Sequence, residues 1–148
     1  MIWLDSNVAI ALLGNRAPAV RRRFDEALST GAAMGLSIIV YHELMYGAAI
    51  SQRRAENERK IALFVAAGNL ALVLFREDDA QHAADIRAHL KRLGTPIGPY
   101  DLLIAAQARR AGEPLVTANG REFERVPGLT VLDWDSNDSI LNTHTAAF

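Results

Sequence analysis

Three carboxylates, those of Asp5, Glu43 and Asp101, stand at points where the sequence predicts that a helix begins. Asp5 and Glu43 each follow a short apolar run typical of a buried strand. Asp101 follows Gly98-Pro99, and a proline at the first helical position makes Asp101 the third helical residue. A single acid in a first turn often does no more than complement the helix dipole. The three acids therefore indicate a functional site only if they lie close together in the folded chain.

The residue types in the chain limit the kinds of functional site that the three acids could form. The chain has no cysteine, its histidines form no cluster, and no glycine-rich phosphate loop is present, so a metal site would offer oxygen ligands only. Such ligands suit a hard cation, Mg²⁺ or Mn²⁺. Three close carboxylates repel one another by roughly 4 kcal/mol per pair at an effective dielectric near 20, and a divalent ion relieves that repulsion. A metal-activated water beside a neutralised phosphate is the chemistry of phosphodiester hydrolysis.

The elements that must position these acids alternate between strand and helix. Helices are predicted to begin near residues 8, 18, 41, 51, 79 and 99, and strands are predicted at 1–4, 34–40, 70–75, 113–117 and 130–132. This alternation predicts an α/β domain with a mostly parallel sheet of about five strands, in which the loops after the strands converge at one edge. Asp5, Glu43 and the loop Thr117-Ala118-Asn119 follow strands, and Asp101 starts the helix that leads into the fourth strand. We expect them to share that edge.

Length and composition fit one domain. Half of the 148 residues are apolar, which suffices for a single core, and we expect a domain at 1–134 followed by a flexible tail at 135–148. The absence of cysteine, of a signal-peptide pattern and of a long apolar run favours a cytoplasmic protein without a membrane segment. The net charge of −1 argues against a globally basic nucleic-acid binder. A local basic surface remains as a weaker hypothesis, with phosphate contacts from Arg21, Arg22, Arg23, Arg53 and Arg54.

Four segments together also resemble one family. They are Asp5-Ser6-Asn7, Tyr41-His42-Glu43-Leu44-Met45-Tyr46-Gly47, Gly98-Pro99-Tyr100-Asp101-Leu102-Leu103-Ile104-Ala105-Ala106, and Thr117-Ala118-Asn119 with Arg121-Glu122-Phe123 and Val126-Pro127-Gly128-Leu129. The order and spacing of these segments resemble those of PIN-domain ribonucleases of the VapC toxin type. The resemblance extends over nearly the whole chain up to Trp134.

The resemblance implies a fold, an activity and partners. The fold would be a three-layer α/β/α sandwich, and the activity that of a Mg²⁺-dependent endoribonuclease cutting tRNA, rRNA or mRNA. The protein would be the toxin of a type II toxin–antitoxin pair, a homodimer held inactive by a VapB-type antitoxin. Asp5 and Asp101 would be the principal metal ligands, and Glu43 would complete the catalytic acids.

The supporting residues implied by the resemblance are Ser6, Asn7, Thr117 and Asn119, which would orient ligands or water. The family's fourth acid is not matched directly, because position 119 carries an amide. Two alternatives stay open: Glu122 supplies that acid, or Glu122 is a surface residue.

Other functions fit the residues less well. A haloacid-dehalogenase-like phosphatase needs a second aspartate two residues after Asp5, where Asn7 stands, and a zinc-protease H-E-x-x-H helix would need histidine at Tyr46. A phosphoacceptor receiver domain would need a distant lysine that does not stand out. The alternative that remains is a non-catalytic PIN-like module that binds RNA or protein, and the presence of all three acids speaks against it.

Overall fold

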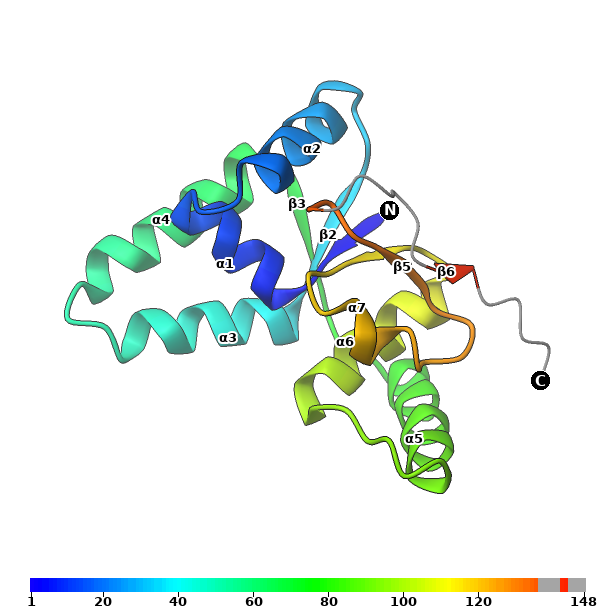
Figure 1. The fold of residues 1–148 in the computed structure, drawn as a ribbon. Coiled ribbons are helices and arrows are strands. Elements are labelled where there is room, and N and C mark those ends of the chain that lie inside the picture. Colours follow the sequence, from blue (N-terminus) through cyan, green and yellow to red (C-terminus); the bar gives the residue numbers. More distant parts are fainter. Residues whose placement is uncertain (136–141, 144–148) are drawn as a thin grey trace.

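The computed structural model describes residues 1–135 and 142–143, and a parallel sheet forms its middle layer (Figure 1). The elements in chain order are β1 (Ile2–Leu4), α1 (Ser6–Gly14), α2 (Pro18–Ser29), β2 (Met34–Ser37), α3 (Ile38–Ala49), α4 (Arg54–Ala67), β3 (Leu70–Val73), α5 (Glu77–Arg92), α6 (Pro99–Ala111), β4 (Leu115–Val116), α7 (Gly120–Phe123), β5 (Thr130–Leu132) and β6 (Asn142–Thr143).

The strand order is β3-β2-β1-β4-β5-β6. The first five strands are parallel, and β6 pairs with β5 in the antiparallel direction. The chain moves outward from β1 to β3 and then returns to the other side of β1 at β4. Right-handed crossovers therefore place α1–α4 on one face and α5 and α6 on the other, as Figure 1 shows. The predicted three-layer α/β/α sandwich is confirmed.

Apolar strand residues form the centre of the core. Leu4 pairs in register with Leu36 on β2 and with Val116 on β4, and all three are fully buried. Of the tail predicted at 135–148, residues 136–141 and 144–148 lie outside the described residues, and Asn142–Thr143 form β6. No helix among the described residues is both long and apolar enough to cross a membrane.

The helix starts predicted near residues 18 and 99 are confirmed, because Pro18 and Pro99 are the first residues of α2 and α6. The strand predicted at 34–40 is wrong after residue 37. The hydroxyl oxygen of Ser37 accepts a hydrogen bond from the amide of Ile39 (3.0 Å) and so caps a helix that begins at Ile38. A short apolar run fits a buried helical turn as well as a buried strand, and periodicity alone does not separate them.

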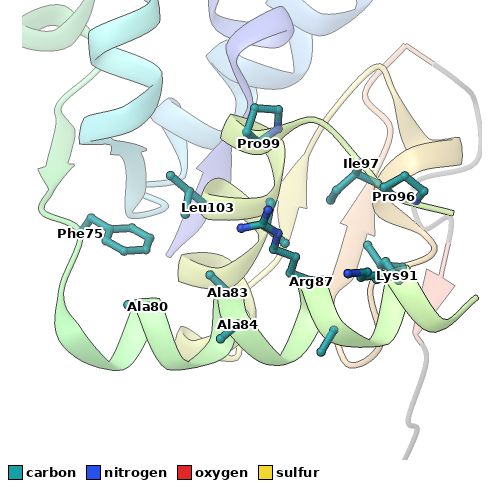
Figure 2. Close-up of a pocket in the computed structure, with 13 residues that line it drawn as sticks. Phe75, Ala80, Ala83, Ala84, Arg87, Lys91, Pro96, Ile97, Pro99 and Leu103 are labelled. Atoms are coloured by element: carbon teal, nitrogen blue, oxygen red, sulfur yellow. The ribbon is translucent and has the colours of Figure 1, made fainter. Parts of the chain in front are cut away.

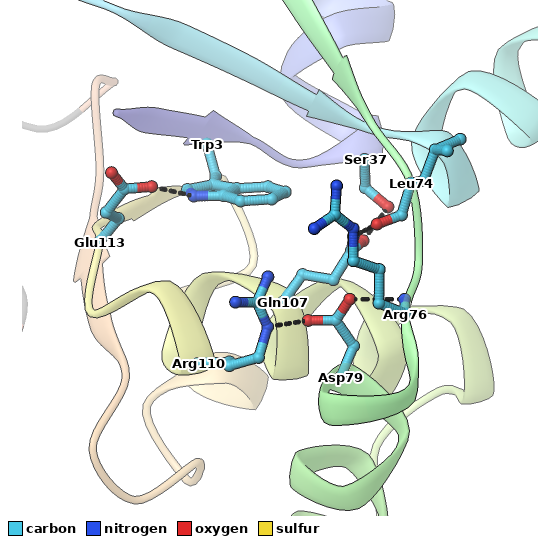
Figure 3. A network of polar contacts seen from close by, with 8 residues as sticks. All are labelled: Trp3, Ser37, Leu74, Arg76, Asp79, Gln107, Arg110 and Glu113. Carbon is cyan, nitrogen blue, oxygen red and sulfur yellow. Dashed lines mark hydrogen bonds and ion pairs between the residues drawn. The ribbon is translucent and has the colours of Figure 1, made fainter.

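A buried amide fastens α6 to the sheet (Figure 3). The side chain of Gln107 on α6 is fully buried. Its oxygen accepts a hydrogen bond from the Ser37 hydroxyl at the end of β2, and its amide nitrogen donates to the carbonyl of Leu74, just after β3 (3.0 Å). The bond to Ser37 is buried and the bond to Leu74 is partly buried, and together they make the position of α6 relative to the strand ends specific.

Three further contacts in Figure 3 involve the start of α5, the far end of α6 and the strand that follows α6. Asp79, the third residue of α5, accepts a hydrogen bond from the amide of Arg76 (2.7 Å), the residue that precedes the helix. The same carboxylate, fully buried, pairs with Arg110 on α6. The indole of Trp3 donates to Glu113 (2.8 Å), which ties β1 to the approach to β4. Together these contacts set the direction in which α6 presents its first turn.

Candidate active site

The carboxyl ends of β1 and β4 are the point at which the sheet changes direction. The connection after β1 crosses to β2 on one side, whereas β4 continues to β5 on the other. In open α/β sheets, ligands bind in the crevice that this divergence creates. Asp5 directly follows β1, and Thr117 directly follows β4.

Asp5 is buried, with 1% of its surface exposed, and is fixed by two hydrogen bonds. One carboxylate oxygen accepts from the backbone amide of Ser6 (2.7 Å), and the other accepts from the hydroxyl of Thr117 (2.8 Å). The Thr117 hydroxyl oxygen accepts in turn from the backbone amide of Asn119 (2.9 Å). A carboxylate has about four lone-pair positions, so Asp5 is oriented and still able to accept a further ligand.

Glu43 lies in a different part of its helix from the part predicted. It is the sixth residue of α3, in the second turn, because α3 begins at Ile38. Its carboxylate accepts a hydrogen bond from the hydroxyl of Ser6. Ser6 therefore links Glu43 to the helix start that Asp5 caps, and the two acids meet as predicted although the helix start was misplaced.

Asp101 is the third residue of α6, as predicted, and is half-buried. Its carboxylate lies back over Gly98, where a side-chain Cβ would come within 2.8 Å of Asp101 Oδ2. Glycine at position 98 thus leaves the space that this carboxylate occupies.

Electrostatics joins these acids into one cluster. Burial is the main cause that raises the pKa of Asp5 from 3.8 to about 6; the hydrogen bonds from Thr117 and Ser6 lower it, and the charges of Asp101 and Glu43 raise it further. Burial also raises the pKa of Asp101, with added repulsion from Glu122 and Glu43. The half-buried Glu122, on α7, is therefore close enough to act on Asp101.

The donor chemistry of this cluster fits a divalent cation. Among the described residues, no three His, Cys, Asp or Glu side chains stand ready in a metal-coordinating arrangement. Mg²⁺ does not require three, since it is usually held by one or two carboxylates and keeps several waters. The buried, mutually repelling carboxylates of Asp5 and Asp101 supply oxygen donors and an excess of negative charge. These residues fit such an ion.

The predicted basic residues lie apart from the acids. Arg21 donates to the carbonyl of Leu12 (2.6 Å), near the end of α1, roughly 10 Å along that helix from its start. Arg53 and Arg54 lie at the start of α4, after the far end of α3, and that end is six residues, about 9 Å along the helix, beyond Glu43. The structure therefore does not bring the arginine candidates, Arg22 and Arg23 on α2 included, into the acid cluster. Asn7 is exposed on the first turn of α1.

Two exposed rings beside the acids were not predicted as site residues. His42 and Tyr100 contact each other edge to face, with centroids 5.7 Å apart and an interplanar angle of 81°. They adjoin Glu43 and Asp101 in sequence and connect α3 to α6. The available signal was the position of each ring immediately before a predicted acid.

Comparisons with known proteins agree with this geometry. A family model described as "PIN domain" matches residues 2–129. The "tRNA(fMet)-specific endonuclease VapC" of Shigella flexneri is 41% identical over 131 residues, covering 88% of this chain and 96% of that protein. The "Ribonuclease VapC2" of Rickettsia felis is 32% identical over 132 residues, covering 89% and 96%.

Solved structures give the same result. The crystal structure of DNA-bound VapBC from Salmonella typhimurium has a TM-score of 0.82 at 38% identity, covering 90% of this chain and 97% of that chain. The structure of VapBC2 from Rickettsia felis, bound to a promoter DNA fragment, has a TM-score of 0.83 at 30% identity, covering 91% and 100%.

Proposed function

This chain belongs to the PIN-domain family and, within it, to the VapC ribonucleases, and from that membership and its acidic site we propose how it cuts RNA. It is an endoribonuclease that acts as the toxin of a type II toxin–antitoxin pair. The observation that carries the assignment to this site is the convergence of Asp5, Glu43 and Asp101 at the sheet's direction change, where the charges of Asp101 and Glu43 help to raise the pKa of Asp5.

Each acid has a distinct place in the proposed reaction. Like PIN-domain nucleases generally, the enzyme depends on a divalent metal; the proposed ion is Mg²⁺, with Mn²⁺ as a substitute, held by Asp5 and Asp101. When bound, the ion would neutralise the phosphate and lower the pKa of a water. Glu43, oriented by Ser6, would complete the acidic site around the ion.

The supporting residues keep the first acid in position. Thr117 fixes one oxygen of Asp5, and the backbone of Asn119 fixes Thr117. Glu122, which acts on Asp101, is proposed as the fourth acid in place of the Asn119 side chain. Asn7, exposed on the first turn beside Asp5, is available to substrate.

The proposed substrate is tRNA, because the 41% identical relative is named for cleavage of tRNA(fMet). Arg53 and Arg54 lie at the end of the arm formed by α3 and α4, and Arg21–Arg23 lie on α2. We propose that they contact phosphates away from the cut, because their positions on α2 and at the start of α4 lie outside the acid cluster. Charge reversal there should weaken tRNA binding and flatten its salt dependence. Unchanged binding would remove them from the footprint.

The proposed partner is a VapB-type antitoxin, since the similar solved structures are VapBC complexes. We propose that it places an Arg or Lys against Asp5 and Asp101, where a guanidinium makes strong charge-assisted bonds. If the affinity for the antitoxin is unchanged when both Asp5 and Asp101 are replaced by neutral residues, this proposal is contradicted. We further propose a PIN domain at 1–134 with a tail at 135–148, a homodimeric state, and action in the cytoplasm, where tRNA is found.

The test is cleavage of labelled tRNA by the purified chain with Mg²⁺, with EDTA, and after Asp101→Asn. Cutting that needs the metal and is lost in the variant supports the nuclease and its central acid together. Binding of tRNA without cutting would favour the non-catalytic module. Cutting that survives Asp101→Asn would place the active site elsewhere.

A further inference from the structure

Two aromatic rings are exposed beside the acid cluster. His42 directly precedes Glu43 on α3, and Tyr100 directly precedes Asp101 on α6. The rings contact each other edge to face, with centroids 5.7 Å apart, so the pair connects the two helices that carry these acids. The Tyr100 side chain is nevertheless 44% exposed, and His42 is exposed as well. Ring surface is therefore available to a ligand directly next to the acids.

The packing of α6 against α5 does not account for the exposed ring. Pro99, Leu102 and Leu103 line the apolar groove between these two helices, and Figure 2 shows Pro99 and Leu103 there. Successive residues of a helix differ in direction by about 100°, and Tyr100 is not among the residues that line this groove. Its ring lies against His42 of α3 instead, on the side of α6 that faces the acid-bearing helix.

The polar atoms of both rings are also unused within the fold. Among residues 1–135 and 142–143, neither the Tyr100 hydroxyl nor the His42 imidazole takes part in a hydrogen bond or an ion pair. The Thr117 hydroxyl, by contrast, donates to Asp5 (2.8 Å). The two rings therefore keep their polar atoms available for a ligand.

RNA that approaches this site needs an attraction that does not depend on charge. The carboxylates of Asp5, Glu43 and Asp101 repel phosphate groups until a cation binds, and the arginine candidates lie outside the acid cluster. An aromatic ring stacks on a nucleobase of any kind, because every base has a flat π face, and the stack needs no positive charge. A ring next to the acids can therefore hold the nucleotide whose phosphate reacts.

We propose that the Tyr100 ring stacks on a nucleobase adjoining the phosphate that is cut, and that His42 is the positioning residue that holds this ring. The proposal rests on the proposed nuclease function and names the contact that binds substrate at the same acids. Edge-to-face contact is a favoured arrangement of two rings, and here it leaves much of the Tyr100 ring exposed. Bases within a duplex are already stacked, so the base that Tyr100 contacts belongs to an unpaired segment of the RNA.

The first experiment measures steady-state cleavage of labelled tRNA. Tyr100→Ala should raise KM about tenfold, a loss typical of removing one base stack, and should leave kcat within about twofold. The reason is that a stack made equally in the ground state and the transition state contributes to binding alone. Tyr100→Phe keeps the ring and should restore KM to within about twofold of the parent value. Tyr100→Leu keeps the apolar volume without the flat ring and should behave as Tyr100→Ala does.

The second ring and a control variant complete this series. His42→Ala should raise KM about threefold through loss of the ring contact. It should add little in the Tyr100→Ala background, because a residue that acts through Tyr100 has no effect once that ring is gone. Leu93→Ala is the matched control and should change neither KM nor kcat. It removes a large side chain that is 59% exposed and lies at the end of α5, outside α3 and α6.

A second experiment detects the stack directly and without cleavage. The Asp5→Asn chain is mixed with a short oligouridine that carries one 2-aminopurine, a base whose fluorescence falls when it stacks on an aromatic ring. Binding should quench the fluorescence, and adding Tyr100→Ala should abolish the quenching and weaken binding about tenfold. The salt dependence of binding should not change, because the ring displaces no counterions. Charge reversal at Arg53 and Arg54 should flatten that dependence.

Three results would overturn the proposal. They are a loss of kcat at unchanged KM in Tyr100→Ala, which would mean that the ring supports the acids, a KM of Tyr100→Leu equal to that of the parent, and quenching that persists without the ring. If Tyr100→Ala does not fold, the comparison of Tyr100→Phe with Tyr100→Leu still decides the question.

The two experiments also separate this proposal from the nuclease function. Ring-dependent quenching without cleavage of tRNA would contradict the nuclease assignment and leave the base contact standing. Cleavage of tRNA without ring-dependent quenching would contradict the base contact and leave the nuclease assignment standing.

Discussion

Replacing Asp5 by asparagine should abolish cleavage and yet stabilise the protein at neutral pH. The carboxyl of Asp5 ionises at about pH 6 in the folded protein, against 3.8 for its ordinary value. Folding therefore disfavours the ionised form of the Asp5 carboxyl. A difference of this size corresponds to about 3 kcal/mol, present in full once both states are ionised.

The sign follows from the two pKa values. Below pH 3.8 the group is protonated in the folded and unfolded chains, and it costs nothing. Between pH 3.8 and about 6 the unfolded chain loses its proton first, so the stability of the parent protein falls as pH rises. Above about pH 6 the full penalty applies. The neutral Asp5→Asn side chain avoids the penalty but weakens the bond from Thr117, at a cost of about 1 kcal/mol.

Urea and thermal unfolding at pH 4 and pH 7.5 measure the balance. Asp5→Asn should be about 0.5 kcal/mol less stable than the parent at pH 4 and about 2 kcal/mol more stable at pH 7.5, a rise of roughly 4–8 °C in Tm. Asp25→Asn, at an exposed position, controls for a general effect of the substitution. Mg²⁺ should stabilise the parent at pH 7.5 through binding to the folded state, and should not stabilise Asp5→Asn. A variant that is destabilised equally at both pH values, or stabilised equally by Mg²⁺, would refute the reasoning.

Three other predictions concern single side chains. Gly98→Ala should displace the Asp101 carboxylate and lower kcat/KM for tRNA cleavage at least about tenfold with little change in Tm. The control is Gly47→Ala, which has open space around it and should leave cleavage unchanged. If Gly98→Ala cleaves tRNA as well as the parent, the position of the Asp101 carboxylate over Gly98 is not needed for cleavage. Asp79→Asn should cost about 3 kcal/mol in urea unfolding, because it leaves Arg110 without its buried partner, and a loss below about 1 kcal/mol would contradict this. Glu122→Gln should remove one of the charges that raise the pKa of Asp101, so the pKa of Asp101 measured by NMR should fall. An unchanged pKa would show that Glu122 does not act on Asp101.

Much of the fold could be predicted from the sequence because its signals are local. Pro99 fixed the start of α6, and with it the third position of Asp101, without tertiary information. The alternation of apolar runs with amphipathic segments likewise predicted a parallel sheet. The meeting of Asp5 with Asp101 follows from topology, since the helix that leads into β4 starts at the edge of the sheet where β1 ends.

What could not be predicted depends on contacts between distant segments. The start of α3 at Ile38 depends on the Ser37 hydroxyl, and the apolar run after it carried no period that distinguishes helix from strand. The proximity of Glu122 to Asp101 joins α7 to α6 across the strand between them. No spacing in the sequence indicated that pair, so the sequence alone left open whether Glu122 supplies the fourth acid.

The repulsion within the acidic cluster favours the binding of a cation. Folding buries Asp5 and brings Asp101 and Glu43 close to it, which lowers stability at neutral pH. A cation that enters the cluster cancels this repulsion, so part of its binding free energy is already present in the unliganded fold. Mg²⁺ and an antitoxin guanidinium would draw on the same repulsion and should therefore compete. Because binding linkage is reciprocal, Mg²⁺ should weaken the antitoxin by the same factor by which the antitoxin weakens Mg²⁺.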